Sequence, residues 1–252
     1  MKVSRLLTYL FIAFCCGSEC HAQRFGVNCS GATDCETAQL YGSVQKVTER
    51  VYKIDFSQRE IRKGENLSVY AVEFNEDGSV RGEQTFDAAG ELLSKTIYQY
   101  KDSMKSVSTS YDATGTRTLQ TLYANTADGV VARMRYTDAI GITISTSEVS
   151  HMPQWAAISE SFNDGEKVIL EYFYNENRRL VRELKSSNNI VTERVLTLDN
   201  AGQPRKAVEK ENRRKTTYEY EHKLDSHNNW IQRIVRRNGE PMQLVEREIV
   251  YF

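Results

Sequence analysis

The sequence contains little proline: only three prolines occur in 252 residues. Because proline cannot donate to a sheet hydrogen-bond ladder, its scarcity leaves room for many uninterrupted strands. Apolar and polar residues alternate with a period of two in 130–136, 168–174 and 216–222, which is typical of strands with one buried and one wet face. Since no segment keeps a helical period, the sequence predicts an all-β chain.

A charge excess of either sign is also lacking, with 33 basic and 34 acidic residues spread along the chain. Proteins that bind nucleic acid usually gather a basic excess on one face. The most basic run, 210–215, lies between two strand-like segments, where a solvated hairpin tip is the natural interpretation. Nucleic acid is therefore not an expected partner.

Long apolar runs are missing outside the first 22 residues. Lys2 and Arg5 precede an apolar run, 6–16, that is too short for a membrane anchor, and Ala22 ends a small-residue cleavage site. This pattern predicts a signal peptide over 1–22, soluble export to the periplasm or cell surface, and no transmembrane segment. Lipid attachment at a nearby cysteine is the alternative, but a small residue does not precede any of them.

Cysteine is scarce once the signal peptide is removed, since only Cys29 and Cys35 remain. A close pair in an exported protein predicts a disulfide that staples the N-terminal segment, 23–39. The histidines His151, His222 and His227 lack the spacing of a zinc site. The sequence therefore predicts no metal site and no cofactor.

One short unit recurs throughout the chain: an extended run ends in an aromatic residue, and a polar turn closed by glycine follows. The copies are FNEDG (74–78), FDAAG (86–90), YDATG (111–115) and YTDAIG (136–141). Aspartate can bond the backbone two residues on, and glycine tolerates the left-handed conformation that closes such a turn. We expect an antiparallel meander of hairpins, forming one extended curved sheet or an open barrel as a single domain over 40–252.

These units resemble the YD repeats of Rhs-type proteins, which build spiralling antiparallel sheet. A closer resemblance is to a group of exported, Rhs-repeat-like Bacteroidetes proteins of unknown function. It rests on the segments LYGSVQKVTE (40–49), YEY (218–220), DSHNNW (225–230) and EREIVY (246–251). The resemblance implies the repeat architecture, but it implies no catalytic residue.

The rhythm of the repeats fails over 142–157, where we expect a long loop or corner. Trp155 lies in this stretch, and a tryptophan outside the repeat is the first candidate for a ligand contact, followed by Trp230. The regularly spaced aromatics are instead expected to form a ladder of cross-strand pairs.

The leading functional hypothesis is a non-catalytic binding or scaffold module of the cell envelope, with a carbohydrate or a protein as its partner. The aspartates of the repeats have a role as turn residues, and no nucleophile motif or phosphate loop is present, so an enzyme is not expected. A glycan-acting hydrolase and a purely structural spacer are the alternatives left open, because a catalytic carboxylate pair cannot be read from sequence.

Overall fold

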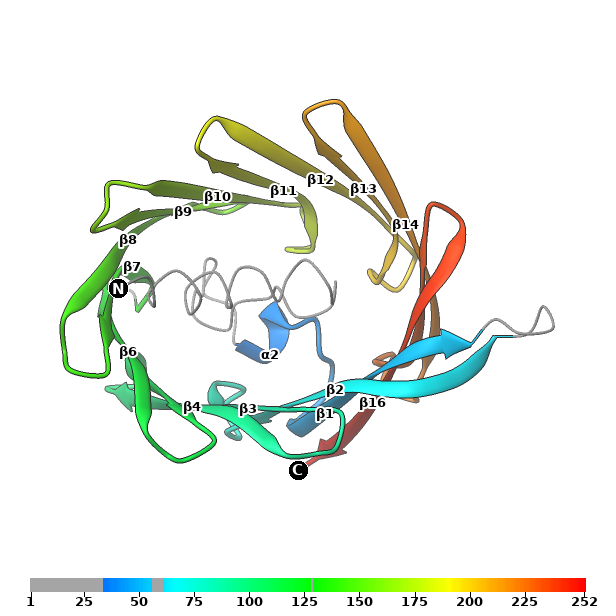
Figure 1. Cartoon of the computed structure of the whole chain (residues 1–252), viewed down its shortest axis with the longest axis horizontal. Helices are drawn as coiled ribbons and strands as arrows, with labels where there is room; N and C mark the ends of the chain where they lie inside the picture. The colour runs from blue at the N-terminus through cyan, green and yellow to red at the C-terminus, as the bar shows by residue number, and fades with distance from the viewer. Residues whose placement is uncertain (1–33, 56–60, 128) are drawn as a thin grey trace.

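The computed structural model describes residues 34–252, apart from 56–60 and 128. The described residues form sixteen antiparallel strands in sequence order, and the last strand pairs with the first to close a barrel (Figure 1). One helical turn, α2 (Asp34–Thr37), lies inside the ring. The strands are β1 (Val44–Asp55), β2 (Arg62–Phe74), β3 (Val80–Phe86), β4 (Leu92–Lys101), β5 (Met104–Asp112), β6 (Arg117–Asn125), β7 (Val131–Asp138), β8 (Thr143–Met152), β9 (Trp155–Phe162), β10 (Lys167–Tyr174), β11 (Leu180–Ser187), β12 (Ile190–Leu198), β13 (Pro204–Glu211), β14 (Arg214–Leu224), β15 (Trp230–Arg237) and β16 (Glu240–Tyr251).

The predicted all-β antiparallel meander is confirmed. Each strand pairs with its neighbours in sequence, and β1 also pairs with β16 through Val47 opposite Ile249 and Val51 opposite Val245. The sheet curls fully onto itself, so the barrel is closed. Closure gives the wall an inner and an outer face.

The Asp-x-x-Gly units have the predicted role in turns. In the hairpin between β3 and β4, the Asp87 carboxylate accepts from the N–H groups of Ala89 and Glu91 at 2.9 and 2.8 Å. The Gly90 N–H donates to the Asp87 carbonyl, and Gly90 has a φ of 89°. The same carboxylate or amide geometry recurs at Asp112, Asp138, Asn175, Asp199 and Asp225.

The long loop predicted over 142–157 is wrong. Strands β8 and β9 run through this stretch and are joined by a tight turn at 153–154. The buried positions of β8 include Ser145 and Ser147, which are 1% and 0% exposed. Because serine occupies the buried face, the alternation of apolar and polar residues is invisible in the sequence. Pro153 lies in the turn, where it interrupts no ladder.

Cross-strand register assigns the two faces of the wall. The α2 residue Asp34 forms an ion pair with Lys105, so this side of β5 faces the interior. Lys105 also lies over the ring of Tyr98, which places Tyr98 on the inner face. Directly opposed residues share a face. The inner face therefore continues from Tyr98 through Ser108, Thr121, Tyr136, Ser145 and Phe162.

The predicted ladder of aromatic pairs is wrong, because the repeat aromatics are opposed by other residue types. Tyr98 faces Ser108, Tyr123 faces Met134, and Tyr111 faces Lys95 on the outer side. Successive turns lie at opposite ends of the barrel, so the aromatics that precede them are separated by the length of a strand. The aromatics thus lie opposite aliphatic, hydroxyl or lysine side chains and do not form aromatic cross-strand pairs.

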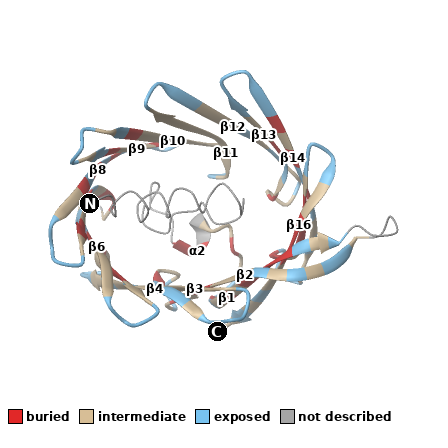
Figure 2. Ribbon diagram, viewed as in Figure 1, coloured by how far each residue is buried: buried red, intermediate tan, exposed pale blue. Residues whose placement is uncertain are grey.

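The apolar side chains form several clusters along the wall. One contains Val131, Met134, Val149, Ala156 and Ile158 on β7–β9, with tyrosines of β6, β7 and β10 packed against it. Others lie under α2, on β13–β15, and at the junction of β1, β15 and β16. Exposed residues concentrate at the hairpin tips (Figure 2). The buried apolar side chains of this single-layer wall are therefore distributed around the ring in separate clusters.

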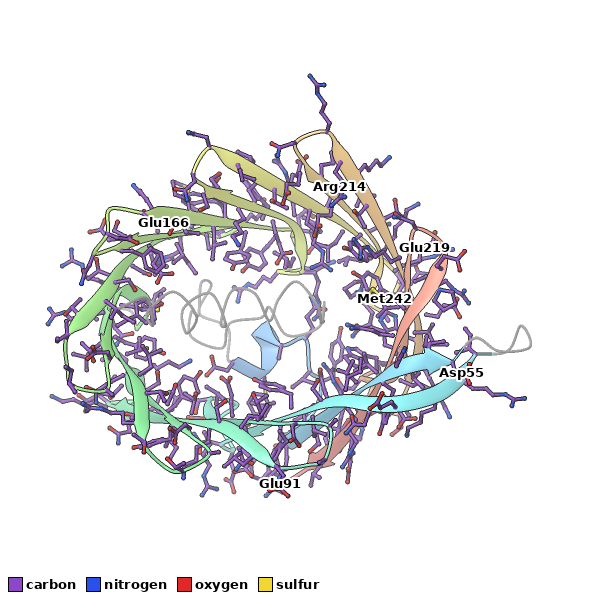
Figure 3. All side chains as sticks on the ribbon, viewed as in Figure 1. Asp55, Glu91, Glu166, Arg214, Glu219 and Met242 are labelled. Atoms are coloured by element: carbon purple, nitrogen blue, oxygen red, sulfur yellow. The ribbon has the colours of Figure 1, made fainter. Side chains whose placement is uncertain are left out.

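The outer face is strongly polar. Side chains stand off both faces of the wall all around the ring (Figure 3). Many of those on the outside form cross-strand ion pairs, and in Arg133–Glu148 the two side chains are 63% and 71% exposed. Each such pair contributes about 0–1 kcal/mol. Further outer pairs are Lys46–Glu73, Arg50–Glu248, Lys63–Glu246, Arg182–Glu193 and Arg236–Glu221.

Asn229 holds the seam of the barrel together at one rim. Its Oδ1 accepts from the Tyr41 N–H, and its Nδ2 donates to the Tyr41 carbonyl and to the Tyr251 hydroxyl, all at 2.8 Å. The Tyr251 hydroxyl in turn donates to Asp225 Oδ2 at 2.5 Å. Burial, followed by the bond to Asp225, raises the pKa of Tyr251 to about 12. The segments 40–49, 225–230 and 246–251 thus meet at the seam.

Tyr41 extends this contact to two more turns of the same rim. Its hydroxyl donates to the Ala201 carbonyl at 3.0 Å and accepts from Arg179, whose guanidinium lies over the Tyr41 ring. Tyr41 therefore joins the turns between β10 and β11, β12 and β13, and β14 and β15.

We expect Asn229→Ala to lower the free energy of unfolding by about 2–4 kcal/mol, because three bonded polar groups would lose their partner at a site that is 1% exposed. The measurement is urea unfolding followed by circular dichroism. Asn200→Ala, at an exposed turn position, is the matched control and should change the midpoint little. Equal midpoints for the two variants would contradict this role for the seam.

Candidate functional site

Trp155 lies on the outer face of the barrel at the start of β9. Its neighbour Ala156 is 0% exposed and belongs to an inner cluster, so alternation turns the Trp155 side chain outward. The ring is half-buried, and its Nε1 donates to Glu171 Oε1 at 3.2 Å. The sequence singled out this residue, but placed it in a loop.

Trp155 belongs to a row of side chains that crosses five strands. Met152 on β8 and Phe173 on β10 lie opposite it, Arg182 on β11 lies opposite Phe173, and Val195 on β12 lies opposite Arg182. The Arg182 guanidinium carbon is 5.0 Å from the Phe173 ring centroid. With strands ~4.8 Å apart, the row is about 19 Å long. We call these five residues the outer row.

Trp230 has a different environment, on the inner side of β15. It is 3% exposed, and its ring lies between two guanidinium groups, with Arg247 at 3.5 Å and Arg233 at 4.0 Å from the centroid. Arg247 is itself held by Glu49 of β1. Trp230 is therefore a buried packing residue of the barrel wall beside the junction of β1 and β16. The structure does not bring the two predicted tryptophans together.

His222 lies beside this cluster and is held neutral. Its Nε2 accepts from Arg233 Nε at 2.9 Å. Burial, together with the nearby charges of Arg233 and Arg247, lowers the pKa of His222 to about 3. The lone pair of His222 is therefore used by an arginine of the adjacent strand, which is a structural contact.

A second polar cluster lies on the inner face of β2–β5, under α2. The Tyr98 hydroxyl donates to Glu83 Oε1 at 2.5 Å. Burial raises the pKa of Glu83, while bonds from Tyr98 and Tyr70 act in the opposite direction. Burial, followed by the charge of Glu83, raises the pKa of both tyrosines. Glu83 is thus a half-buried carboxylate that accepts hydrogen bonds from phenol groups.

Asp34 and Lys105 form a buried ion pair next to Glu83, with Nζ 3.1 Å from Oδ1 and each side chain 7% exposed. Burial lowers the pKa of Lys105, and Asp34 acts in the opposite direction. The sequence did not identify these residues, since Asp34 lies in an aperiodic segment and Lys105 in an ordinary strand. The one indication is Lys105 itself, a lysine at a position of β5 that the structure shows to face inward.

The predicted disulfide stays a prediction. Cys35 is 7% exposed and packs in the cluster under α2, whereas Cys29 lies outside the described residues. Across the described ranges, 34–55, 61–127 and 129–252, no group of three or more histidine, cysteine or carboxylate side chains is placed to hold a metal ion. None of the helices in the described part of the chain is long and apolar enough to cross a membrane.

Comparison with known proteins gives similarity at the level of the fold. No family model and no curated protein matches the chain. A porin-like protein from Bacteroides uniformis is 16% identical, with a TM-score of 0.57 over 83% of this chain and 99% of its own. A porin-like protein from Bacteroides vulgatus is 12% identical, with a TM-score of 0.44 over 83% and 98%. The first of these likenesses supports the barrel fold.

The neutral state of His222 predicts a pH dependence of stability. The folded pKa of about 3 lies below the ordinary value of 6.5, so between these values the unfolded chain binds a proton that the folded chain does not. Wild-type stability should fall as the pH drops through 6.5 toward 3, by at most about 1.4 kcal/mol per pH unit from this group. His222→Gln keeps an acceptor for Arg233 and should remove that part of the slope.

Urea unfolding at pH 4, 5, 6, 7 and 8 measures this difference. The two proteins should differ by a constant amount above pH 7 and by a changing amount below it. Parallel stability curves over the whole range would show that His222 is not the responsible group.

Proposed function

We propose that the protein is an exported, non-catalytic binding module of the cell envelope that binds carbohydrate on the outer row. The observation that carries this proposal is the pairing of Trp155 with Phe173 on the outer face of β9 and β10. Two adjacent aromatic rings on one side of a rigid sheet offer apolar surface for the faces of sugar rings.

The polar groups around the row favour carbohydrate over protein. Glu171 accepts from Trp155 Nε1, and Arg182 bonds to Glu193 Oε1 at 2.8 Å beside the Phe173 ring. Sugar hydroxyls can both donate to such carboxylates and accept from such a guanidinium. The core of a protein interface is instead depleted of charged residues. A row that contains Arg182, with Glu193 bonded to it, has the mixed character that a polyhydroxy ligand requires.

The ion pairs of the outer face support an aqueous location. Arginine and lysine side chains facing lipid cost about 2–4 kcal/mol each near the bilayer midplane, and carboxylates cost less. The outer pairs Arg50–Glu248, Arg133–Glu148 and Arg236–Glu221 lie on three different parts of the wall. We therefore favour a barrel in the periplasm or at the cell surface, in water, over a bilayer-embedded barrel of the kind that the name of the Bacteroides uniformis protein suggests.

The hydrolase alternative has less support than binding. In the described part of the chain, Glu83 and Glu183 are the carboxylates with a raised pKa, and burial is the largest cause, as a general acid requires. Glu83 already accepts from the Tyr98 hydroxyl, and Glu183 forms an ion pair with Arg194 at 3.7 Å. Both belong to packed networks of the inner face. The resemblance to Rhs-type repeats stays compatible with a scaffold role, which predicts no ligand.

Trp155→Ala is expected to weaken glycan binding at least tenfold, because removal of an aromatic anchor at a binding site typically costs more than about 1.4 kcal/mol. The measurement is a glycan array followed by calorimetry on any glycan retained. Tyr111→Ala removes another half-buried aromatic of the outer face, away from the row, and should bind as wild type does. Binding unchanged by Trp155→Ala, or an array without hits, would contradict the proposal.

The location is tested by cell fractionation. We expect the full chain to be exported and recovered in the soluble periplasmic or extracellular fraction, since the outer ion pairs are compatible with water. Recovery only after detergent extraction of the outer membrane would contradict an aqueous barrel.

A further inference from the structure

We propose that Lys105 and the Val80 N–H form a carboxylate-binding site on the inner face of the barrel, and that Asp34 is its exchangeable occupant. This inference does not depend on carbohydrate binding at the outer row. The ligand class is an anion with a carboxylate group, and the chain supplies one example from its own sequence.

The geometry of the site is that of an anion receptor. Lys105 Nζ is 3.1 Å from Asp34 Oδ1, and the Val80 N–H donates to Oδ2 at 2.8 Å. The Lys105 ammonium thus contacts one carboxylate oxygen of Asp34, and the Val80 N–H donates to the other. The Tyr100 hydroxyl lies 3.3 Å from Oδ2 and 2.7 Å from the Val80 carbonyl, so its single hydrogen is better placed for the carbonyl.

The receptor and its occupant differ in how firmly the fold holds them. Val80 begins β3 and is 0% exposed, and Lys105 lies near the start of β5, so both belong to the wall. Asp34 belongs to α2, which has four residues. A helix of this length has no stability of its own and depends on its contacts. Besides the carboxylate, α2 is attached through the Cys35 N–H, which donates to the Gly78 carbonyl at 3.0 Å, and through the Cys35 side chain, which packs in the cluster under α2.

The energetics of a buried ion pair also favour exchange. The attraction between two buried charges is largely offset by their lost hydration, so the intact pair adds little net stability. Removal of one partner is expensive, because the other charge stays buried. A carboxylate from solution that replaced Asp34 would therefore restore the same contacts with Lys105. In the wild-type chain the tethered Asp34 has a high effective concentration and prevails over dilute competitors.

The experiment opens the site and refills it with formate. Asp34→Ala removes the carboxylate and leaves room for one small anion beside Lys105. We expect formate to raise the thermal midpoint of Asp34→Ala saturably, relative to chloride at the same ionic strength, as a ligand that binds the folded state does. Asp34→Asn keeps the shape of the side chain and fills the site with an amide, so it should respond to formate and chloride alike.

The double variant Asp34→Ala, Lys105→Met removes the cation of the receptor together with its occupant. The formate response should disappear in it, since the cation that binds the anion is gone while the carboxylate of Glu83 remains nearby. Recovery of the fold of Asp34→Ala only in formate would also support the proposal. It would be overturned by an equal formate response in the double variant, by no response in Asp34→Ala, or by an Asp34→Ala chain that does not fold at any formate concentration.

Discussion

The pairing of β1 with β16 is the constraint on which the rest of the structure depends. A meander of hairpins leaves one edge of its first strand and one edge of its last strand unpaired. Only the pairing of these two edges closes the barrel and separates an inside from an outside. Val47 opposite Ile249 fixes the register of this union. Asn229 then bonds to Tyr41 across 188 positions of sequence, so one buried amide joins the N-terminal segment to the closing strands.

Closure explains why the two faces differ in chemistry although both have charged side chains. On the outer face, residues pair with neighbours on adjacent strands, as Arg133 does with Glu148. On the inner face, curvature brings side chains together and α2 covers part of the wall, so charges such as Lys105 are desolvated and need defined partners. Two inner-face residues therefore have shifted pKa values: the pKa of Glu83 is raised and that of His222 is lowered. The exposed carboxylate of Asp112 has its pKa lowered by bonds within its own turn.

The features that depend on nearby residues can be predicted from the sequence. Strand alternation and the turns at Asp87 and Asp112 follow from neighbours within five residues, and both were predicted. Closure cannot be predicted locally because it depends on contacts such as Tyr41–Asn229. The turn around Asn229 gives no indication in the sequence of its distant partner. The strand β8 was missed because Ser145 and Ser147 occupy its buried face. The buried pair of Asp34 and Lys105 could not be predicted, since one member lies outside any periodic segment.

Closure also restricts how another molecule can recognise this protein. Every described strand has a hydrogen-bonded neighbour on each side, so the backbone donors and acceptors of its paired residues are used within the ring. Strand addition, a common way for extended peptides to bind to a sheet, is therefore excluded along the paired part of the wall. It needs an overhanging segment such as 62–68 of β2, which pairs with β1 but not with β3. Elsewhere, recognition must use side chains on a face of the wall or the turns at a rim. The same property protects a chain rich in β-structure from edge-to-edge association with its own copies.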